Sequence, residues 1–365
     1  MRHIVVVGAS LAGLRTAEAV RRLGHRGPIT IVGAEPHPPY DRPPLSKGLL
    51  AGRVSTLPLA TELEAELVLG TPVVSLDPDR HQITLADGRR TQYDGLVIAT
   101  GARAAGVDGA WTLRSLDDAV ALRDQLLRGR RITVLGGGFL GNEIAVAARQ
   151  RGCEVDLVMR QALPLLAAAG EPVANLVADL HRRAGVILHP QTAKYPSADL
   201  LVAAIGARPN TEWLQGSGLQ LSDGVVCDRW LRPLGQDGDI VAVGDVVRWP
   251  HPLAGGEAIT VQHWSNAVDQ AETAARNLLF PEQPVPFSAV PSFWSDLYDA
   301  RLRAVGLPRF GSPVVEEQDL DARRLVVTYW RDSELVGALT VNRTSRLAQY
   351  RAELAARLIQ PKVKA

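Results

Sequence analysis

The sequence predicts an α/β protein with two Rossmann-like dinucleotide-binding domains and a small α+β C-terminal domain. Two glycine-rich turns, at residues 8–13 and 136–141, carry this prediction, because each follows an apolar strand and precedes a helical pattern. Glycine permits a tight reversal and lets the backbone approach a pyrophosphate, whose charge a helix N-terminus stabilises. One such turn is weak evidence, but two in one chain indicate a flavoprotein that exchanges electrons with a nicotinamide cofactor.

The first dinucleotide unit has all the expected parts. An apolar strand at 4–7 is followed by the turn, a helix over 12–23 and a second strand at 29–32. A carboxylate about 20 residues past the glycines binds ribose hydroxyls in such units, so Glu35 is the candidate ribose ligand. Ser10 replaces the middle glycine but is small enough to fit. The predicted turn contacts are Gly8, Ser10, Leu11, Ala12 and Gly13.

The second unit lacks the ribose carboxylate, because its strand at 155–158 ends in Met159 and Arg160. Two interpretations have equal weight. Either Arg160 binds the 2′-phosphate of NADPH, or it is a solvated surface arginine and nicotinamide binding is weak. The predicted contacts of this turn are Gly136, Gly138, Phe139, Leu140 and Gly141.

A proline-rich segment at residues 38–47 follows the first unit. Its four prolines are expected to rule out a helix and to stiffen an extended segment. Such a segment fixes polar side chains against a ligand. The side chains concerned are Tyr40, Asp41, Arg42 and Lys47.

Three further apolar strands end at candidate ligand positions. The strand at 93–98 ends in Ala99, Thr100 and Gly101, a corner of small residues that a cofactor can approach closely. The strand at 199–206 ends at Gly206, and the strand at 239–245 delivers Gly244 and Asp245 at its carboxyl end. Ligands of open α/β sheets bind at that end of the strands.

A helix is predicted over residues 260–279, with Gln262, His263 and Trp264 in its first turns. The start of such a helix stabilises negative charge on a reduced flavin ring. After Pro281, strands near 302–306, 324–330 and 335–342 and a helix over 346–358 indicate the α+β domain. The predicted divisions are 1–108 with 223–284 for FAD, 109–222 for a shortened NAD(P)H domain, and 285–365 for the C-terminal domain.

Composition excludes several functions. The net charge of +1 gives no reason to expect a nucleic acid partner, and no apolar segment is long enough to span a bilayer, so we expect a cytoplasmic protein. Cys153 and Cys227 form no Cys-x-x-Cys pair, which argues against a redox disulfide and favours a core position for both. No His and Cys set has metal-ligand spacing, so no metal is expected.

Taken in order, these segments resemble the FAD-dependent ferredoxin reductases that feed bacterial oxygenases, a group that includes rubredoxin and putidaredoxin reductases. The resemblance covers almost the whole chain. Its most specific parts are residues 39–47, 99–101, 136–143, 206–210, 244–245, 263–264 and 293–296.

The resemblance implies hydride transfer from the nicotinamide to flavin N5, followed by one-electron transfers to a ferredoxin-type iron–sulfur protein. Lys47 is expected near N5 and paired with Glu143, and these two are the implied catalytic residues. The alternatives are a solvent-exposed lysine and a helix-surface carboxylate. The implied FAD ligands are Gly8, Ser10, Leu11, Ala12, Gly13, Glu35, Arg42, Lys47, Ala99, Thr100, Gly101, Gly244, Asp245, His263 and Trp264. The implied NAD(P)H ligands are the residues of the second turn together with Arg160 and Gly206.

The departures from the family pattern lie mainly on the nicotinamide side. Besides Met159, residues 189–197 are expected to be a bare bridge where the family has a three-stranded β-meander. Gln262 and Leu297 replace a usual Glu and Gln. We favour a working reductase. One alternative is a diverted FAD scaffold that oxidises a small-molecule substrate, and another is a non-catalytic FAD-bound subunit.

The sequence leaves the electron acceptor and the oligomeric state open. An acidic ferredoxin needs a basic docking patch, for which Arg301, Arg303 and Arg309 are the candidates. The net charge near zero gives this patch no general support.

Overall fold

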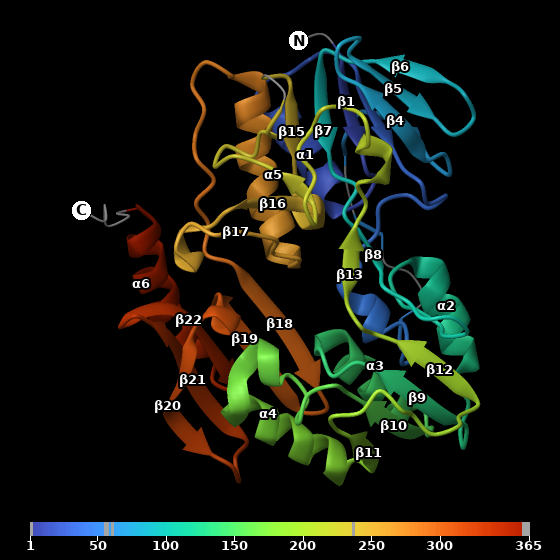
Figure 1. Cartoon of the computed structure of the whole chain (residues 1–365), viewed down its shortest axis with the longest axis vertical. Coiled ribbons are helices and arrows are strands. Elements are labelled where there is room, and N and C mark those ends of the chain that lie inside the picture. Colours follow the sequence, from blue (N-terminus) through green and yellow to red (C-terminus); the bar gives the residue numbers. More distant parts are fainter. Residues whose placement is uncertain (1–2, 55–57, 60–61, 236–237, 360–365) are drawn as a thin grey trace. The chain divides into compact units, whose positions relative to one another are not determined.

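A computed structural model describes residues 3–54, 58–59, 62–235 and 238–359 of the chain (Figure 1). The chain forms two compact units, and each is assembled from three separate stretches of sequence. Unit 1 consists of residues 1–41, 58–103 and 208–291. Unit 2 consists of residues 42–57, 104–207 and 292–365.

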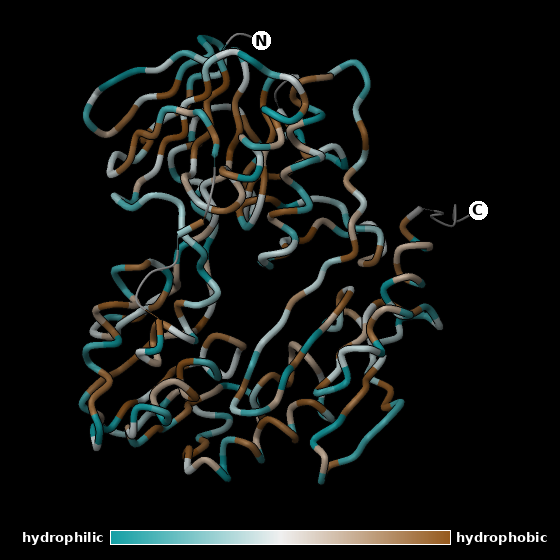
Figure 2. The backbone as a smooth tube through the Cα atoms, turned by 180° about the vertical axis from the view of Figure 1, so that it is seen from behind, coloured by the Kyte–Doolittle hydropathy of each residue, from teal (hydrophilic) through white to brown (hydrophobic). Residues whose placement is uncertain are grey.

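Unit 1 is built on a five-stranded parallel sheet. In spatial order its strands are β15 (Ile240–Ala242), β7 (Gly95–Ile98), β1 (Ile4–Val7), β2 (Ile29–Val32) and β3 (Glu66–Val68). The helices α1 (Leu11–Arg22) and α5 (Trp264–Leu279) pack against each other beside this sheet (Figure 1). Strands β1, β2 and β7 are buried along their whole length, as the apolar runs predict, and Figure 2 shows the hydrophobic residues concentrated along such strands.

Smaller elements complete unit 1. One is an antiparallel sheet of β4 (Val73–Asp77), β5 (Gln82–Leu85) and β6 (Arg90–Gln92). A second small sheet contains β14 (Val225–Val226), β16 (Val247–Pro250) and β17 (Ala258–Ile259). The 3₁₀ turns are η2 (Glu212–Leu214), η3 (Gly244–Val246) and η4 (Pro252–Ala254). The chain passes between the units along β8 (Ala102–Ala104) and β13 (Ala207–Pro209), which pair with each other.

Unit 2 contains the second parallel sheet, in the order β11 (Val186–His189), β10 (Glu154–Val158), β9 (Arg131–Leu135) and β12 (Leu200–Ala203). Its helices are α2 (Leu116–Gln125), α3 (Phe139–Gln150) and α4 (Leu166–Arg183). The predicted bridge is found: residues 190–199, all of them described, form neither helix nor strand, although His189 itself ends β11.

The C-terminal part of unit 2 is a five-stranded antiparallel sheet, in the order β18 (Ser292–Leu297), β19 (Ala300–Gly306), β22 (Glu334–Val341), β21 (Arg324–Arg331) and β20 (Ser312–Asp319). The helix α6 (Leu347–Ile359) contacts β19 and β22, and the short turns are η5 (Pro308–Phe310) and η6 (Thr344–Arg346). Its core continues into α4 through residues that include Val173, Val177, Val327 and Leu339. The α/β fold class with an α+β C-terminal part is thus confirmed, although β18 and β20 escaped the prediction.

The longest helix of unit 2 was missed in the sequence. The helical span α4 is interrupted at Gly170, which has the left-handed φ of 74°, and Pro172 follows within the next turn. Proline is tolerated in a first helical turn because its missing N–H would have no partner there. The sequence Gly-Glu-Pro therefore reads as a helix stop although it is the start of the longer helical segment.

Two other boundaries differ from the prediction. The helix predicted over 260–279 begins only at Trp264, because His263 is its N-cap in extended conformation, so Gln262 and His263 precede the helix. The segment 38–47 is not free of helix, because the 3₁₀ turn η1 (Pro43–Ser46) occupies its end. The two prolines at the start of η1 preset φ for such a turn.

The predicted division into three domains stays a prediction. The compact units change over at residues 103/104 and 207/208, whereas the predicted boundaries are 108 and 222. The predicted nicotinamide and C-terminal domains cluster together in unit 2, with residues 42–57 added. Residues 360–365 of the predicted C-terminal domain lie outside the described residues.

Acid should destabilise the fold through its buried histidines. Burial lowers the pKa of His251 to about 4, from an ordinary value of 6.5. The unfolded chain then binds a proton that the folded chain excludes, so stability is complete above pH 6.5 and falls as the pH approaches 4. At pH 5 this single group costs about 2 kcal/mol.

The substitution His251→Asn tests this, because the ring accepts a hydrogen bond from the Leu253 N–H as an N-cap and asparagine provides an equivalent acceptor. We expect the variant to lose less stability than the wild type between pH 7 and pH 5 in thermal unfolding. An identical pH slope in both proteins would contradict the prediction.

Candidate functional site: two dinucleotide turns and a buried ion pair

The first turn is closed by backbone contacts that only glycine allows. Gly8 has φ of +124°, and a Cβ on it would lie 2.1 Å from the carbonyl oxygen of Ala99. A Cβ on Gly13 would lie 2.0 Å from the Gly8 oxygen. Strand β1, helix α1 and the corner after β7 therefore meet at one point. Ser10 is the extended N-cap of α1, and Leu11 is buried in its first turn.

Glu35 follows strand β2, as expected for a ribose ligand. The Tyr40 hydroxyl, from the proline-rich segment, donates a hydrogen bond to the Glu35 carboxylate. Tyr40 is buried and Glu35 is partly exposed, so the tyrosine orients a carboxylate that solvent or a ligand can still reach. The sequence singled out Tyr40 but gave no partner for it.

The corner at residues 99–101 is tied to the turn at 208–210. The Thr100 hydroxyl donates to the Asn210 carbonyl over 2.8 Å, and the Asn210 amide donates back to the Thr100 carbonyl over 2.9 Å. Gly101 has φ of +63° and open space where a Cβ would lie. Asn210 was part of the quoted pattern without a role, and the structure shows it fixing this corner.

Asp245 lies in η3, directly after the strand predicted to deliver it. The N–H of Gly244 donates to the side-chain oxygen of Gln270 on α5 over 2.7 Å, and Gln270 is fully buried. The sequence gave no indication of this glutamine. At the start of α5, the indole N–H of Trp264 donates to Asp41 over 2.8 Å, so Asp41 fixes the direction of that indole.

The second turn repeats the geometry of the first in unit 2. A Cβ on Gly136 would lie 2.2 Å from the Ala204 oxygen, and one on Gly141 would lie 1.9 Å from the Gly136 oxygen. Gly138 differs, because its φ of −76° suits any residue and a Cβ there would meet nothing within 4 Å. Neither the backbone nor protein packing requires glycine at 138, and its lack of a side chain leaves open space beside the turn.

The other residues of the predicted NAD(P)H site differ in their surroundings and exposure. Gly206 has φ of +121° with open space beside it. Phe139, the first residue of α3, packs edge-on against Phe293, with ring centroids 4.9 Å apart, and Leu140 follows it. Met159 is buried against the turn, with its sulfur 3.3 Å from the Cβ position of Gly137, whereas Arg160 is exposed.

Lys47 and Glu143 form the predicted ion pair in unit 2, with 2.8 Å between Nζ and Oε2. The Ser295 hydroxyl donates to the other carboxylate oxygen over 2.6 Å, and the Ser46 hydroxyl donates to Oε2. Glu143 is 7% exposed, which excludes the helix-surface alternative. Three donors satisfy the buried carboxylate, as a buried charge requires.

Arg42 also belongs to unit 2, where its guanidinium donates to the Arg114 carbonyl over 2.7 Å. The other predicted FAD ligands belong to unit 1. They are Gly8, Ser10, Leu11, Ala12, Gly13, Glu35, Ala99, Thr100, Gly101, Gly244, Asp245, His263 and Trp264.

The described residues do not indicate thiol or metal chemistry. Cys153 and Cys227 are free and buried, and burial raises the pKa of both thiols, so neither forms a reactive thiolate readily. Among the residues that the structure describes, no cluster of His, Cys, Asp and Glu is suited to a metal ion. No described helix is both long and apolar enough to cross a bilayer.

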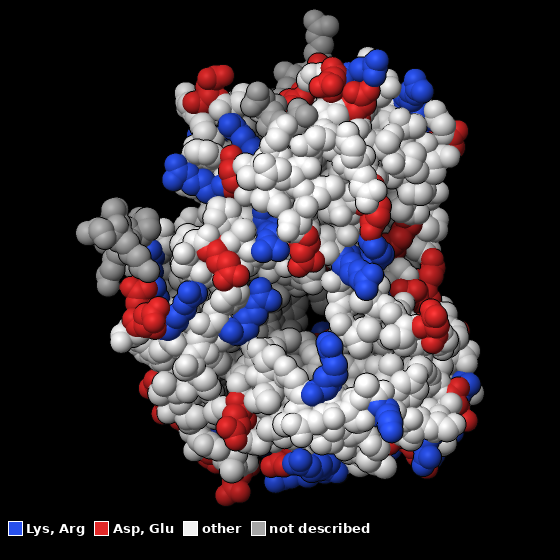
Figure 3. All heavy atoms as spheres, viewed as in Figure 1, with Lys and Arg blue, Asp and Glu red and all other residues white. Residues whose placement is uncertain are grey.

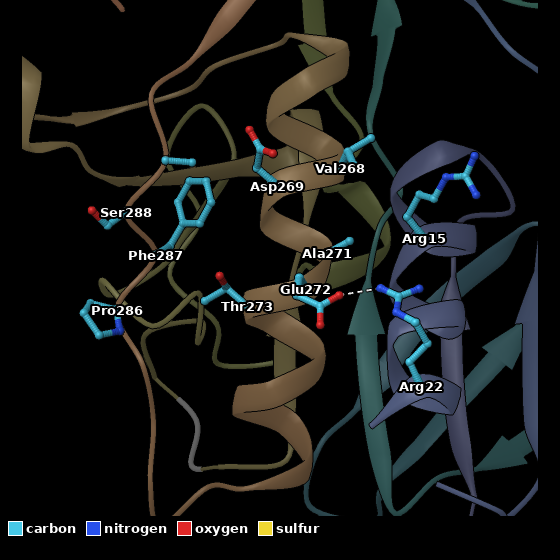
Figure 4. A pocket seen from close by; sticks show the side chains of 11 residues that line it. Arg15, Arg22, Val268, Asp269, Ala271, Glu272, Thr273, Pro286, Phe287 and Ser288 are labelled. Atoms are coloured by element: carbon cyan, nitrogen blue, oxygen red, sulfur yellow. Dashed lines mark hydrogen bonds and ion pairs between the residues drawn. The ribbon is translucent and has the colours of Figure 1, made fainter. Parts of the chain in front are cut away.

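A hollow of about 490 Å³ in unit 1 lies apart from these predicted ligands. Figure 4 shows it between α1, α5 and the segment 286–289, with Arg15, Arg22 and Glu272 on its wall. Its arginines are already paired, Arg22 with Glu272 and Arg15 with Glu18. The hollow therefore offers no unpaired arginine to an anionic ligand.

Both turns fit a dinucleotide. Each combines a closed strand–helix corner with helix N–H groups, and open space lies beside Gly138 and Gly101. The fold and these turns define a class: α/β oxidoreductases that hold two dinucleotides.

Comparison with known proteins identifies the family. A model described as pyridine nucleotide-disulphide oxidoreductase matches residues 2–271, and one described as reductase C-terminal matches residues 292–364. The chain therefore belongs to the pyridine nucleotide-disulphide oxidoreductase family, and it is an FAD- and NAD(P)H-dependent oxidoreductase.

Individual relatives agree over nearly the whole chain. The ferredoxin–NAD(+) reductase component of the anthranilate 1,2-dioxygenase system of Burkholderia cepacia is 35% identical, with 93% of this chain and 90% of that protein covered. Putidaredoxin reductase of Pseudomonas putida is 32% identical, with 98% and 92% covered. The crystal structure of a covalent putidaredoxin reductase–putidaredoxin complex superposes with a TM-score of 0.90, at 32% identity and with 98% and 93% covered.

The two kinds of glycine in the second turn should separate binding from stability. Gly138→Ala adds a methyl group that meets no protein atom, so we expect an unchanged unfolding midpoint but weaker NAD(P)H binding by tenfold or more. Gly141→Ala is the control, because its Cβ would overlap the Gly136 oxygen, and overpacking of this kind costs about 1–3 kcal/mol. Thermal unfolding and calorimetric titration measure the two effects. Equal destabilisation by both variants would contradict the assignment of Gly138.

Proposed function

We propose that the chain passes electrons from NAD(P)H through FAD to a ferredoxin-type iron–sulfur protein. The observation that carries the proposal is the repeated strand–turn–helix geometry at residues 8–13 and 136–141. Relatives named as ferredoxin–NAD(+) and rubredoxin–NAD(+) reductases support the class of acceptor. They favour this function over a substrate-oxidising dehydrogenase and over a non-catalytic subunit.

Bound FAD supplies the redox chemistry, because its ring accepts a hydride and releases the electrons singly. The chain contributes binding and orientation. The start of α1 provides N–H groups for the pyrophosphate, and Glu35, held by Tyr40, accepts hydrogen bonds from ribose hydroxyls. Trp264 provides an aromatic surface whose direction Asp41 fixes. Binding of FAD by Arg42 and Lys47 stays a prediction.

Lys47 and Glu143 are the proposed catalytic pair. The ion pair with the buried carboxylate holds the ammonium group of the lysine in one place. A fixed ammonium group stabilises negative charge that develops during hydride transfer, without reorganisation at the moment of reaction. The hydroxyls of Ser46 and Ser295 also donate to the Glu143 carboxylate and thereby hold it in position beside Lys47.

The proposed NAD(P)H contacts lie in unit 2. They are Gly136, Gly138, Phe139, Leu140, Gly141, Arg160 and Gly206. The exposed side chain of Arg160 supports a choice of NADPH, because Arg160 lies directly after Met159, the position at the end of β10 where a ribose carboxylate is expected. The names of the relatives indicate NADH for those proteins.

The docking patch at Arg301, Arg303 and Arg309 stays a prediction. Arg303 is paired with Asp296 over 2.7 Å, and Arg309 lies over the Phe310 ring. Figure 3 shows side chains of both charges scattered over the face in view. Such a surface favours recognition by local contacts over long-range steering of an acidic partner.

An anaerobic titration with NADH and, separately, NADPH tests the function. We expect stoichiometric loss of the flavin's visible absorbance, and then reduction of an added ferredoxin. If neither nucleotide bleaches the flavin while dithionite still reduces it, the proposal that NAD(P)H is the electron donor is contradicted. Bleaching without transfer to any ferredoxin or rubredoxin would contradict the proposed acceptor.

Arg160→Ala tests the choice of nicotinamide. If Arg160 binds the 2′-phosphate, the variant should lose affinity for NADPH by about tenfold, the equivalent of about 1.4 kcal/mol, and little affinity for NADH. Arg182→Ala is the matched control, because Arg182 is an exposed arginine of unit 2 paired with Asp179 on α4. Equal losses for both nucleotides would remove the 2′-phosphate assignment.

A cytoplasmic location is part of the proposal. It is supported by the two free cysteines, since reduced thiols persist in that compartment. Cell fractionation with an antibody against the chain tests it, and recovery in an extracytoplasmic fraction would contradict it.

A further inference from the structure

A buried asparagine lies directly beneath the second glycine turn. Asn142, in the first turn of α3, is fully buried, and its side-chain amide donates to the carbonyls of Gly137 over 3.0 Å and Gly138 over 2.7 Å. The Leu165 N–H donates to the same Gly137 carbonyl over 2.8 Å. Both carbonyls are thus held toward the buried Asn142, and that of Gly138 also accepts the helix bond from the Asn142 backbone N–H over 3.1 Å.

Holding the carbonyls also aims the N–H groups. In a trans peptide the C=O of one residue and the N–H of the next point in opposite directions. The inward carbonyls of Gly137 and Gly138 therefore direct the N–H groups of Gly138 and Phe139 outward. A Cβ of Gly138 would meet no protein atom, so the backbone at this residue borders open space.

The asparagine is itself held by the fully buried His181, which in turn contacts the partly buried Tyr298. His181 of α4 places Nε2 2.7 Å from the Asn142 side-chain oxygen, and its Nδ1 is 2.9 Å from the Tyr298 hydroxyl. Because the amide nitrogen of Asn142 donates, its oxygen must accept, so Nε2 carries the proton and Nδ1 accepts from Tyr298. Burial lowers the pKa of His181 to about 4, which keeps this arrangement neutral at pH 7.

The network joins the turn to the C-terminal sheet. Tyr298 lies in the hairpin between β18 and β19, where it has the left-handed φ of 58°. The same hairpin supplies Ser295 to Glu143, the neighbour of Asn142 on α3. One hairpin therefore holds two adjacent residues of α3, of which one supports the turn and the other pairs with Lys47.

We propose that Asn142 is a positioning residue for the pyridine nucleotide, and that it aims the N–H groups of Gly138 and Phe139 at the nucleotide's pyrophosphate. His181 and Tyr298 transmit this orientation from the C-terminal sheet. The inference rests on the proposed function, because it concerns the same nicotinamide site. An apolar side chain would fill the buried position without desolvating three polar groups, so packing does not account for the network.

The test compares three variants of the FAD-bound full chain. Asn142→Leu removes the two side-chain hydrogen bonds to the Gly137 and Gly138 carbonyls and keeps the backbone bonds to them, and Tyr298→Phe removes only the last hydroxyl of the network. Tyr329→Phe is the matched control, because Tyr329 is a buried tyrosine of the same sheet whose hydroxyl donates to Ala169 over 2.7 Å, outside the network. Calorimetric titration with ADP-ribose, NADH and NADPH gives the dissociation constants, and steady-state kinetics give KM and kcat.

We expect Asn142→Leu to weaken ADP-ribose and the better nicotinamide donor by at least tenfold. Tyr298→Phe should weaken them two- to fivefold and Tyr329→Phe less than 1.5-fold. In the Asn142→Leu and Tyr298→Phe variants, KM for the nicotinamide donor should rise while kcat at saturation falls less than threefold. The FAD content of both variants should stay that of the wild type. Tyr298→Phe keeps the inference testable if the leucine variant fails to fold.

Two results would overturn the inference alone: wild-type affinity in the Tyr298→Phe variant, or equal loss in the Tyr298→Phe and Tyr329→Phe variants. A wild-type protein that binds neither NADH nor NADPH would contradict the proposed function and this inference together. The two failures are therefore distinguishable from the wild-type titration.

Discussion

The organisation of unit 2 depends on the ion pair and hydrogen bonds of the buried Glu143 carboxylate. Its oxygens accept hydrogen bonds from Ser46 and Lys47 of the proline-rich segment and from Ser295 of the C-terminal hairpin. Two stretches that are far apart in sequence therefore converge on Glu143 near the start of α3. A buried charge that loses a partner is costly, so the carboxylate enforces this convergence. The adjoining Asn142 applies the same principle with neutral groups.

The two dinucleotide turns show that one physical device is used twice. In each turn, glycine lets a helix and a neighbouring strand approach a backbone carbonyl closely, at Ala99 in unit 1 and at Ala204 in unit 2. The turns differ in the middle position, which is Ser10 in one and Gly138 in the other. Both residues are extended N-caps of their helices, but the glycine has no side chain and leaves open space. The same corner thus presents two different surfaces to its ligand.

The predicted NAD(P)H-binding part of unit 2 departs from the family pattern but keeps its strand–turn–helix arrangement. Met159, at the position expected for a ribose carboxylate, is a buried packing residue beneath the turn. The bridge after β11 is held by backbone bonds, since the Met159 N–H donates to His189 and the Thr192 N–H donates to Met159. The strand end is therefore stabilised by backbone pairing, and an adjacent exposed residue, Arg160, remains to contact a ligand.

The sequence by itself determined the two turns, the apolar strands that lead into them and the position of Glu35, because these depend on local periodicity and on glycine. It did not reveal α4, whose Gly170 and Pro172 interrupt the pattern, and it began α5 too early, before the N-cap His263. Only the tertiary structure identified Gln270, Asn210 and the His181–Tyr298 support as partners of the turns. Their partners lie tens to more than a hundred residues away, and a hydrogen bond over such a separation leaves no periodic signal in the chain.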